Sequence, residues 1–331
     1  MIILTYHNIV RRPPNMLNDV VRKWDKVSAF EQQMQTLAEH FKIVPLEEIV
    51  QAIGAGKTLD RACAITFDDG YRGDYLYAAP VLERFGFTAT FYVITQRVRE
   101  TGRYAPVDFD RLEALLQLTA QTRIDLTGFG FGIVSLADNE ARLDFIKKLT
   151  KQLKVTPAAI KKNLDASLDR QLEVPEEKIA AYLEQEAYQM MSWEEIEDLQ
   201  RRGFTIGSHT RTHPSLSQID ATQLEFEICG SYQDLRERLG LHEMTLAYPY
   251  GKADHISGAV AAVAQRAGYS CALTSIKEIN TPATEIFQLR RIGFKDLMKM
   301  NGALNDSTTF AHHRSTPFGN DTAGEHDRTT R

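Results

Sequence analysis

The sequence predicts an α/β fold, a parallel (β/α) barrel of seven or eight strands that carries a mainly helical insertion. Short β-branched and apolar runs alternate along the chain with segments whose apolar residues recur at helical spacing. The run from Ala62 to Phe67 is almost wholly apolar, which is typical of a parallel strand buried on both faces. The alternation lapses between about residues 97 and 191 and then resumes, so this stretch is expected to be the insertion.

The first third of the chain establishes the alternation of strand and helix. We expect strands at residues 2–6, 41–44, 63–67 and 88–94, and helices at 28–41, 45–53 and 80–85. Ser28 and Glu31 have the spacing of a capping box, which predicts that the first helix begins at Ser28. Pro80 suits the first turn of a helix, and Gly86 suits its end.

Within the insertion, helical patterns cover residues 111–118, 141–153 and 176–190, and the glycine-rich stretch 123–134 is expected to form a hairpin or loop. Ser192 and Glu195 then form a second capping box, which opens a helix that should stop at Gly203. Further strands are expected at 204–207, 245–248, 271–273 and 289–292, with helices at 224–239 and 256–267. The expected domain is therefore a barrel over 1–304, followed by a polar, disordered tail over 305–331.

The composition limits the classes of function. With 331 residues, 43% hydrophobic and 25% charged, the chain can bury a large core. A net charge of −5 without a basic run argues against nucleic acid as a partner. Cys63, Cys229 and Cys271 are odd in number and far apart, which favours buried thiols over disulfides or a zinc knot.

The chain shows no pattern of membrane insertion or export. No window approaches the roughly 20 apolar residues of a membrane span. Met1 leads into a strand-like segment without the features of a leader peptide. We therefore expect a cytoplasmic protein without a transmembrane segment, which is compatible with peripheral membrane association.

Polar groups gather at the ends of three predicted strands. These groups are Asp68-Asp69-Gly70, the segment Ser208-His209-Thr210-Arg211-Thr212-His213-Pro214, and Tyr248-Pro249-Tyr250-Gly251. Since the carboxyl ends of barrel strands open on one face, the three groups are expected to converge there. Taken singly, each motif is more typical of a turn or a surface histidine pair. Together they predict an active site.

One carboxylate and two histidines form the ligand set of a catalytic zinc site that keeps one position open for water. Pro214 disfavours helical geometry at His213, so the histidines are expected on a compact turn. A metal bound there would polarise a carbonyl and lower the pKa of a water molecule to roughly 7. The second carboxylate could then serve as the base, although the residues alone do not tell which role belongs to Asp68 and which to Asp69.

These residues together resemble the polysaccharide deacetylase family, the NodB-homology domain of carbohydrate esterase family 4. Residues 66–70 have the form of its first motif, 208–214 the form of its second, and 248–251 the form of a common variant of its third. Their order also agrees, and the likeness covers most of Met1 to about Met300. The resemblance implies a distorted (β/α) barrel of the polysaccharide deacetylase type, which removes the acetyl group from an N-acetylhexosamine.

Carried over by position, the resemblance implies that Asp68 is the general base and that Asp69, His209 and His213 bind a divalent metal. Zinc is the expected metal, with cobalt, nickel or iron as alternatives. The backbone N–H of Tyr250 would help to hold the oxyanion. The expected substrate is an N-acetylated glycan or lipid-linked sugar that belongs to a bacterial polysaccharide or its precursor.

Two positions depart from the family pattern. Ala247 stands where an arginine usually orients the base, and residues 288–292 lack the histidine that usually protonates the leaving amine. Arg291, at the end of the last predicted strand, is a candidate for the orienting role, and His7, at the end of the first, is a candidate general acid. A structural ion pair and a neutral rim histidine are the alternative interpretations. His255, near the third motif, is a weaker candidate for the acid.

Two other functions fit part of the pattern. Two histidines and a carboxylate also describe the facial triad of non-haem iron oxygenases. The departures from the family pattern would fit a catalytically silent glycan-binding barrel. The adjacent second aspartate and the barrel pattern argue against the oxygenase, and acetate release would exclude the silent barrel. The sequence therefore predicts a metal-dependent hydrolase, a sugar N-deacetylase.

Overall fold

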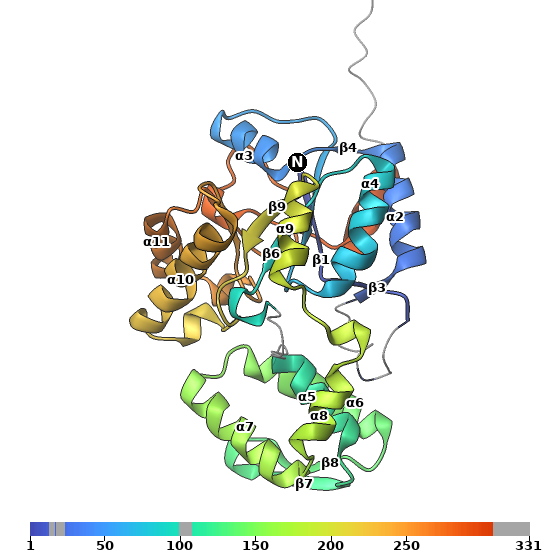
Figure 1. The fold of residues 1–331 in the computed structure, drawn as a ribbon, viewed down its shortest axis with the longest axis vertical. Coiled ribbons are helices and arrows are strands. Elements are labelled where there is room, and N and C mark those ends of the chain that lie inside the picture. The colour runs from blue at the N-terminus through green and yellow to red at the C-terminus, as the bar shows by residue number, and fades with distance from the viewer. Residues whose placement is uncertain (13–16, 18–23, 99–107, 307–331) are drawn as a thin grey trace, which may run out of the picture. The chain divides into compact units, whose positions relative to one another are not determined.

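The computed structural model describes residues 1–12, 17, 24–98 and 108–306 (Figure 1). Its central sheet contains β1 (Ile2–Tyr6), β4 (Lys42–Ile43), β5 (Ala62–Phe67), β6 (Thr90–Val93), β9 (Thr205–Ser208), β10 (Thr245–Ala247) and β11 (Cys271–Leu273). The order is β1-β5-β6-β9-β10-β11, with β4 also paired to β5, and every pairing is parallel. The α/β barrel prediction is confirmed. Strand β5 is buried along its whole length, as its apolar run predicts.

The segment predicted as a last strand, 289–292, links the edge strands β11 and β1. Within the described residues, its ladder contacts are two isolated parallel bridges, from Leu289 to Leu273 and from Ile292 to Leu4. The prediction of a regular strand at 289–292 is therefore wrong, and the segment forms two isolated bridges instead. The reason is that the N–H groups of the two arginines between them bond to a loop: Arg290 donates to the Asn280 side chain and Arg291 to the Ile276 carbonyl.

In the described part of the chain, the helices that flank the strands are α2 (Val27–His40), α3 (Leu46–Gly54), α4 (Ala79–Phe85), α9 (Trp193–Arg201), α10 (Ala221–Leu239) and α11 (Gly258–Ala267). Helix α2 lies beside α4, and α10 lies beside α11 (Figure 1). The capping box of Ser192 and Glu195 opens α9, and Gly86 ends α4 in the left-handed conformation, both as predicted. A π-helical turn over Asp74–Ala78 leads directly into α4.

The start of α2 differs from the prediction. Its N-cap is Lys26, which makes no side-chain capping hydrogen bond, and Ser28 lies within the first turn. Lys26 is also the last residue of β3 (Trp24–Lys26), which pairs with β2 (Asn8–Val10). This strand pair, which sequence reasoning missed, determines where the helix begins.

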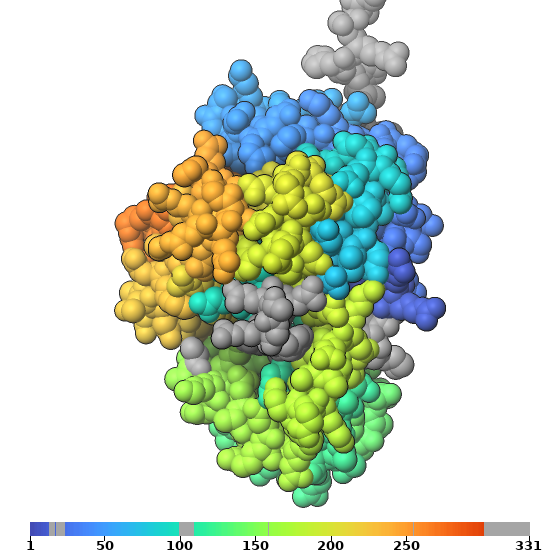
Figure 2. Space-filling view, in the orientation of Figure 1, coloured from blue at the N-terminus to red at the C-terminus, as the bar shows by residue number. Residues whose placement is uncertain are grey.

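The insertion has secondary structure and an apolar core of its own. It contains α5 (Asp108–Leu118), the antiparallel hairpin β7 (Arg123–Leu126) and β8 (Gly132–Ser135), α6 (Asn139–Leu153), α7 (Ala158–Leu172) and α8 (Glu176–Leu183). Buried side chains such as Leu112, Ile146 and Leu183 belong to one cluster. The outer side chains of these elements appear in green shades in the space-filling view (Figure 2).

The structure differs from the prediction at two helices of the insertion. Helix α7 was not predicted, although Leu164, Leu168 and Leu172 recur every four residues and are buried. The helix predicted at 176–190 ends at Leu183, and a 3₁₀ turn follows at Glu186–Tyr188. After that turn the chain is extended, because Met190 pairs with Tyr71 in an antiparallel bridge.

The chain divides into a unit over Met1–Phe294 and a second unit from Lys295 onward. The described part of the second unit is residues 295–306, which belong to helix α12 (Phe294–Asp306). Residues 307–331, which are most of the predicted tail, lie outside the described residues, and the domain boundary at 304 stays a prediction. No helix in the described parts of the chain combines the length and the apolar character needed to cross a bilayer.

Candidate active site

The three predicted motifs follow β5, β9 and β10, which belong to one parallel sheet. Asp68, Asp69, His209, His213 and Tyr250 all line one cavity of about 450 Å³. Three of these residues have positive φ: 73° at Asp69, 67° at His213 and 61° at Tyr250. Such a conformation costs a non-glycine residue about 1–3 kcal/mol and is typical of functional sites. The backbone is therefore strained where the motifs meet.

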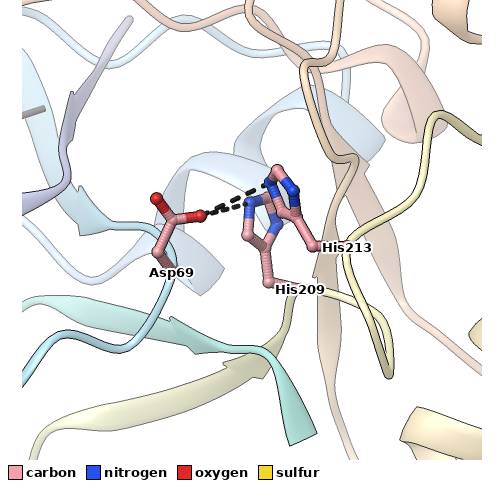
Figure 3. Close-up of side chains that lie close together, drawn as sticks. All are labelled: Asp69, His209 and His213. Atoms are coloured by element: carbon pink, nitrogen blue, oxygen red, sulfur yellow. Dashed lines mark ion pairs between the residues drawn. The ribbon is translucent and has the colours of Figure 1, made fainter. Parts of the chain in front are cut away.

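Asp69, His209 and His213 form a compact buried group (Figure 3). Oδ1 of Asp69 lies 3.4 Å from Nε2 of each histidine. Nδ1 of His209 lies 2.7 Å from the carbonyl oxygen of Ala247. Because a carbonyl oxygen can only accept, Nδ1 carries a proton, and Nε2, the nitrogen on the side of Asp69, is the atom that a neutral imidazole would offer to a metal. One carboxylate and two imidazoles, one of them fixed in this tautomer, fit zinc or another divalent transition metal.

The loop that carries the two histidines is held by Glu227 of α10, a residue that sequence reasoning missed. Its carboxylate accepts hydrogen bonds from the backbone N–H of Arg211 at 3.0 Å and of Thr212 at 2.8 Å, and from the Thr212 hydroxyl at 2.6 Å. These bonds compensate for the burial of Glu227. The loop is not helical, as Pro214 predicts. The available sequence signal was an acidic residue beside the apolar stripe of a helix.

Asp68 is paired with Arg291. Nη1 of Arg291 donates to Oδ1 at 2.7 Å and Nη2 donates to Oδ2 at 2.8 Å, while Nε donates to the Thr274 carbonyl at 2.9 Å. Burial alone would raise the pKa of Asp68, but the Arg291 guanidinium, with smaller contributions from His209 and His7, holds this pKa below its usual value. Asp68 is therefore ionised at neutral pH, and each oxygen retains lone-pair capacity for a further hydrogen bond.

Arg291 reaches Asp68 across 223 positions of the sequence. Ala247 lacks the guanidinium expected at its own position, and its carbonyl oxygen accepts from His209 instead. The structure thus brings the candidate arginine against the candidate base.

Replacing Arg291 with methionine is expected to lower the free energy of unfolding by about 3–5 kcal/mol, because the Asp68 carboxylate would remain buried without its counter-charge. Urea unfolding measures the loss. Arg290→Met is the matched control, because Arg290 pairs with Glu278 at a partly exposed site, where an ion pair contributes about 0–1 kcal/mol. Equal losses in the two variants would contradict a structural role for the buried pair.

The remaining predicted residues differ in their places around the cavity. His7 lines it, as does Tyr250, whose ring centroid lies 4.9 Å from that of His213. His255 is not among the described residues that line this cavity, although its ring lies 5.6 Å from that of Tyr250. The structure therefore brings His7, but not His255, into the cavity that contains Asp68.

The insertion also contributes to the cavity, which sequence reasoning did not predict. Phe109 of α5, Lys147 and Thr150 of α6, and Lys154 directly after α6 line it. The Phe109 and Tyr250 ring centroids are 5.8 Å apart. The insertion thus supplies part of the wall of the cavity onto which the three motifs open.

Comparison with known proteins shows which family model and which solved structures this chain resembles. The family model for polysaccharide deacetylase matches residues 55–133 and 136–272. The Streptococcus pyogenes deacetylase PplD in complex with acetate shares 17% identity at a TM-score of 0.56, over 90% of this chain and 96% of that one. IcaB from Ammonifex degensii shares 18% identity at a TM-score of 0.56, over 90% of this chain and 95% of that one. The BpsB deacetylase domain from Bordetella bronchiseptica shares 17% identity at a TM-score of 0.50, over 88% of this chain and 94% of that one. No curated protein matches the chain.

Proposed function

This chain belongs to the polysaccharide deacetylase family, and from that premise we propose that it removes the acetyl group from an N-acetylhexosamine in a bacterial polysaccharide or its precursor, with the help of a divalent metal. Membership makes the chain a hydrolase of non-peptide carbon–nitrogen amide bonds. One observation carries the finer proposal. The ionised Asp68 and the buried group of Asp69, His209 and His213 share a single cavity.

In this proposal Asp69, His209 and His213 hold the metal. When bound, a divalent metal polarises the acetyl carbonyl and lowers the pKa of a water molecule to roughly 7. Zinc suits this set of ligands, and cobalt, nickel or iron would also accept it. The bond from His209 to the Ala247 carbonyl keeps the imidazole in the tautomer and orientation that metal binding needs.

Asp68 is the proposed general base, which takes a proton from the attacking water. Arg291 supports this role in two ways, because its paired hydrogen bonds fix the plane of the carboxylate and its charge keeps the carboxylate ionised. The backbone N–H of Tyr250 is the proposed donor to the oxyanion that forms on the acetyl oxygen. Arg291 is thus a positioning residue, whereas Asp68 and the Tyr250 peptide would contact the reacting atoms.

The leaving amine needs a proton, and His7 is the proposed donor. It lines the same cavity as Asp68 and lies close enough to influence the pKa of that carboxylate. Its position after β1 differs from that of the usual family histidine, which would belong to residues 288–292. This placement supports a general acid that approaches the substrate from another strand end.

We expect His7→Gln to lower the rate of amide hydrolysis roughly 10²-fold, because an unprotonated amine is a poor leaving group. Hydrolysis of 4-nitrophenyl acetate should fall much less, since nitrophenolate leaves without a proton. Acetate release and nitrophenolate absorbance measure the two reactions. The control is His242→Gln on the exposed surface. An equal fall for both substrates would instead indicate a general structural role for His7.

The proposal is tested by measuring acetate released from N-acetylhexosamine oligomers and from lipid-linked N-acetylhexosamines, with each divalent metal added in turn. Release of acetate without oxygen consumption is the expected result. If the metal-loaded protein binds these sugars and releases no acetate from any of them, the silent glycan-binding barrel becomes the better description.

A further inference from the structure

Five lysines surround the cavity of the proposed active site and a second cavity that adjoins it. We define the lysine cluster as Lys147, Lys148, Lys151, Lys154 and Lys252. The first three belong to α6, Lys154 follows the end of α6, and Lys252 follows the third motif of the barrel. The second cavity, of about 660 Å³, shares Thr150, Lys154 and Lys252 with the first. The cluster therefore joins the insertion to the catalytic face.

Four of the five lysines have no acidic partner among the residues that the structure describes. Within the described part of the chain, Lys147, Lys148, Lys151 and Lys252 form no ion pair, and no acidic residue lines the second cavity. The ammonium of Lys154 lies 5.5 Å from the centre of the Tyr250 ring and 6.0 Å from that of Phe109. In a chain of net charge −5, this is a local excess of positive charge next to a cavity.

A structural explanation accounts for only part of the cluster. Basic residues near the end of a helix interact favourably with its dipole, which explains Lys151 and Lys154. Lys147 and Lys151, however, stand four residues apart, a spacing at which like charges destabilise a helix. Lys252 follows a barrel strand and is not part of α6, so a preference for basic residues in the last turn of that helix does not account for it. Binding of an anion would stabilise all of these positions together.

The cluster lies one aromatic ring away from the proposed metal site. Lys154 contacts the Tyr250 ring, and the centroid of this ring is 4.9 Å from that of His213. An anion at the cluster would therefore be attached to the sugar that presents its acetyl group, or to the next one. A phosphate monoester carries about −1.5 to −2 charge at pH 7 and three acceptor oxygens, so it gains more from several point-like ammonium groups than a singly charged carboxylate does. Among the described residues, the second cavity is lined by four lysines and His255, and by no arginine.

We propose that the lysine cluster binds a phosphate group carried by the N-acetylated saccharide, so that the substrate is a phosphorylated glycan or glycan precursor. This inference rests on the proposed deacetylase function and adds the class of its substrate. The acetyl group would lie at Asp69, His209 and His213, while the phosphate would lie between α6 and Lys252.

The test compares binding of N-acetylchitotetraose and of the same tetramer bearing a 1-phosphate, by isothermal titration calorimetry at low and high salt. The wild type should bind the phosphorylated tetramer about tenfold or more tightly, as the sum of several partly exposed charge pairs, and the advantage should shrink at high salt. The triple variant Lys147→Gln/Lys151→Gln/Lys252→Gln should lose this preference. The corresponding arginine triple should keep it.

The matched control is Lys57→Gln/Lys162→Gln/Lys178→Gln, which removes the same charge from exposed positions away from both cavities. It should bind the phosphorylated tetramer as the wild type does. Equal binding of the neutral and phosphorylated tetramers by the wild type would overturn the inference. Tighter binding of a tetramer that carries a hexuronate would overturn the assignment to phosphate.

Acetate release separates this inference from the proposed function. Binding of the phosphorylated tetramer that depends on the cluster, without acetate from any substrate, would support the anion site and contradict the deacetylase. Deacetylation of the neutral and phosphorylated tetramers with equal efficiency, in the wild type and in the triple variant alike, would support the deacetylase and overturn the anion site. A polyprenyl diphosphate N-acetylhexosamine in phosphatidylcholine vesicles, assayed beside the soluble tetramer, distinguishes a lipid-linked from a soluble source of the phosphate.

Discussion

Asp68→Asn is expected to lower kcat/KM for deacetylation about 10²- to 10⁴-fold, the usual contribution of a general base. Asparagine has the same shape but cannot take a proton from water. It also leaves Arg291 buried without a counter-charge, so the unfolding of the variant has to be measured beside its activity. Because Asp69, His209 and His213 are unchanged, the variant should still bind one equivalent of metal.

The control for this prediction is Asp60→Asn, which makes the same chemical change at a fully exposed carboxylate. It should retain the activity and the stability of the wild type. Activity of Asp68→Asn within a few-fold of the wild type, at equal metal content, would remove Asp68 from the mechanism. Loss of metal together with activity would mean that Asp68, not Asp69, is the carboxylate ligand.

Asp69→Asn is expected to abolish deacetylation at stoichiometric metal, because the site loses its charged ligand. Groups that merely orient metal ligands typically change affinity about 10- to 100-fold, so loss of a direct ligand should weaken binding by at least about 10²-fold. Competition with a fluorescent zinc chelator measures the affinity, and acetate release measures the activity. A large excess of metal should restore part of the activity in Asp69→Asn but none in Asp68→Asn.

Removal of the metal from the wild type gives an independent check of the same site. Dialysis against a chelator should abolish deacetylation, and addition of zinc, cobalt, nickel or iron should restore it to different extents. His213→Gln should resemble Asp69→Asn, whereas His242→Gln, at an exposed position, should behave as the wild type does. Full activity of the chelated protein would contradict a metal-dependent mechanism.

The convergence of the three motifs was predictable because each is a local pattern. The apolar run 62–67 specifies a buried strand, and the carboxylates come directly after it. His209 likewise follows β9 by one residue, and Pro214 excludes a helix at the second histidine. Because a parallel strand delivers the next residues to a defined edge of the sheet, the convergence of these groups follows from sequence order and strand direction.

Errors in the prediction arose where a distant contact outweighed the local signal. Ser28 and Glu31 have the spacing of a capping box, yet the pairing of β3 with β2 starts the helix at Lys26. The pattern at 176–190 looks helical throughout, but the bridge from Met190 to Tyr71 draws the chain into an extended conformation. In both cases the bonding partner lies outside the segment whose pattern made the prediction: it is β2 (Asn8–Val10) in the first case and Tyr71 in the second.

The sequence by itself determined the fold class, the family resemblance and the two aspartates and two histidines of the proposed centre, because these depend on periodicity and on residues adjacent to strand ends. Only the tertiary structure decided that Arg291 would pair with Asp68, that Glu227 would hold the histidine loop and that lysines of the insertion would meet Lys252. These contacts join residues from separate elements. Their formation depends on how the barrel closes and how the insertion packs, which no local spacing encodes.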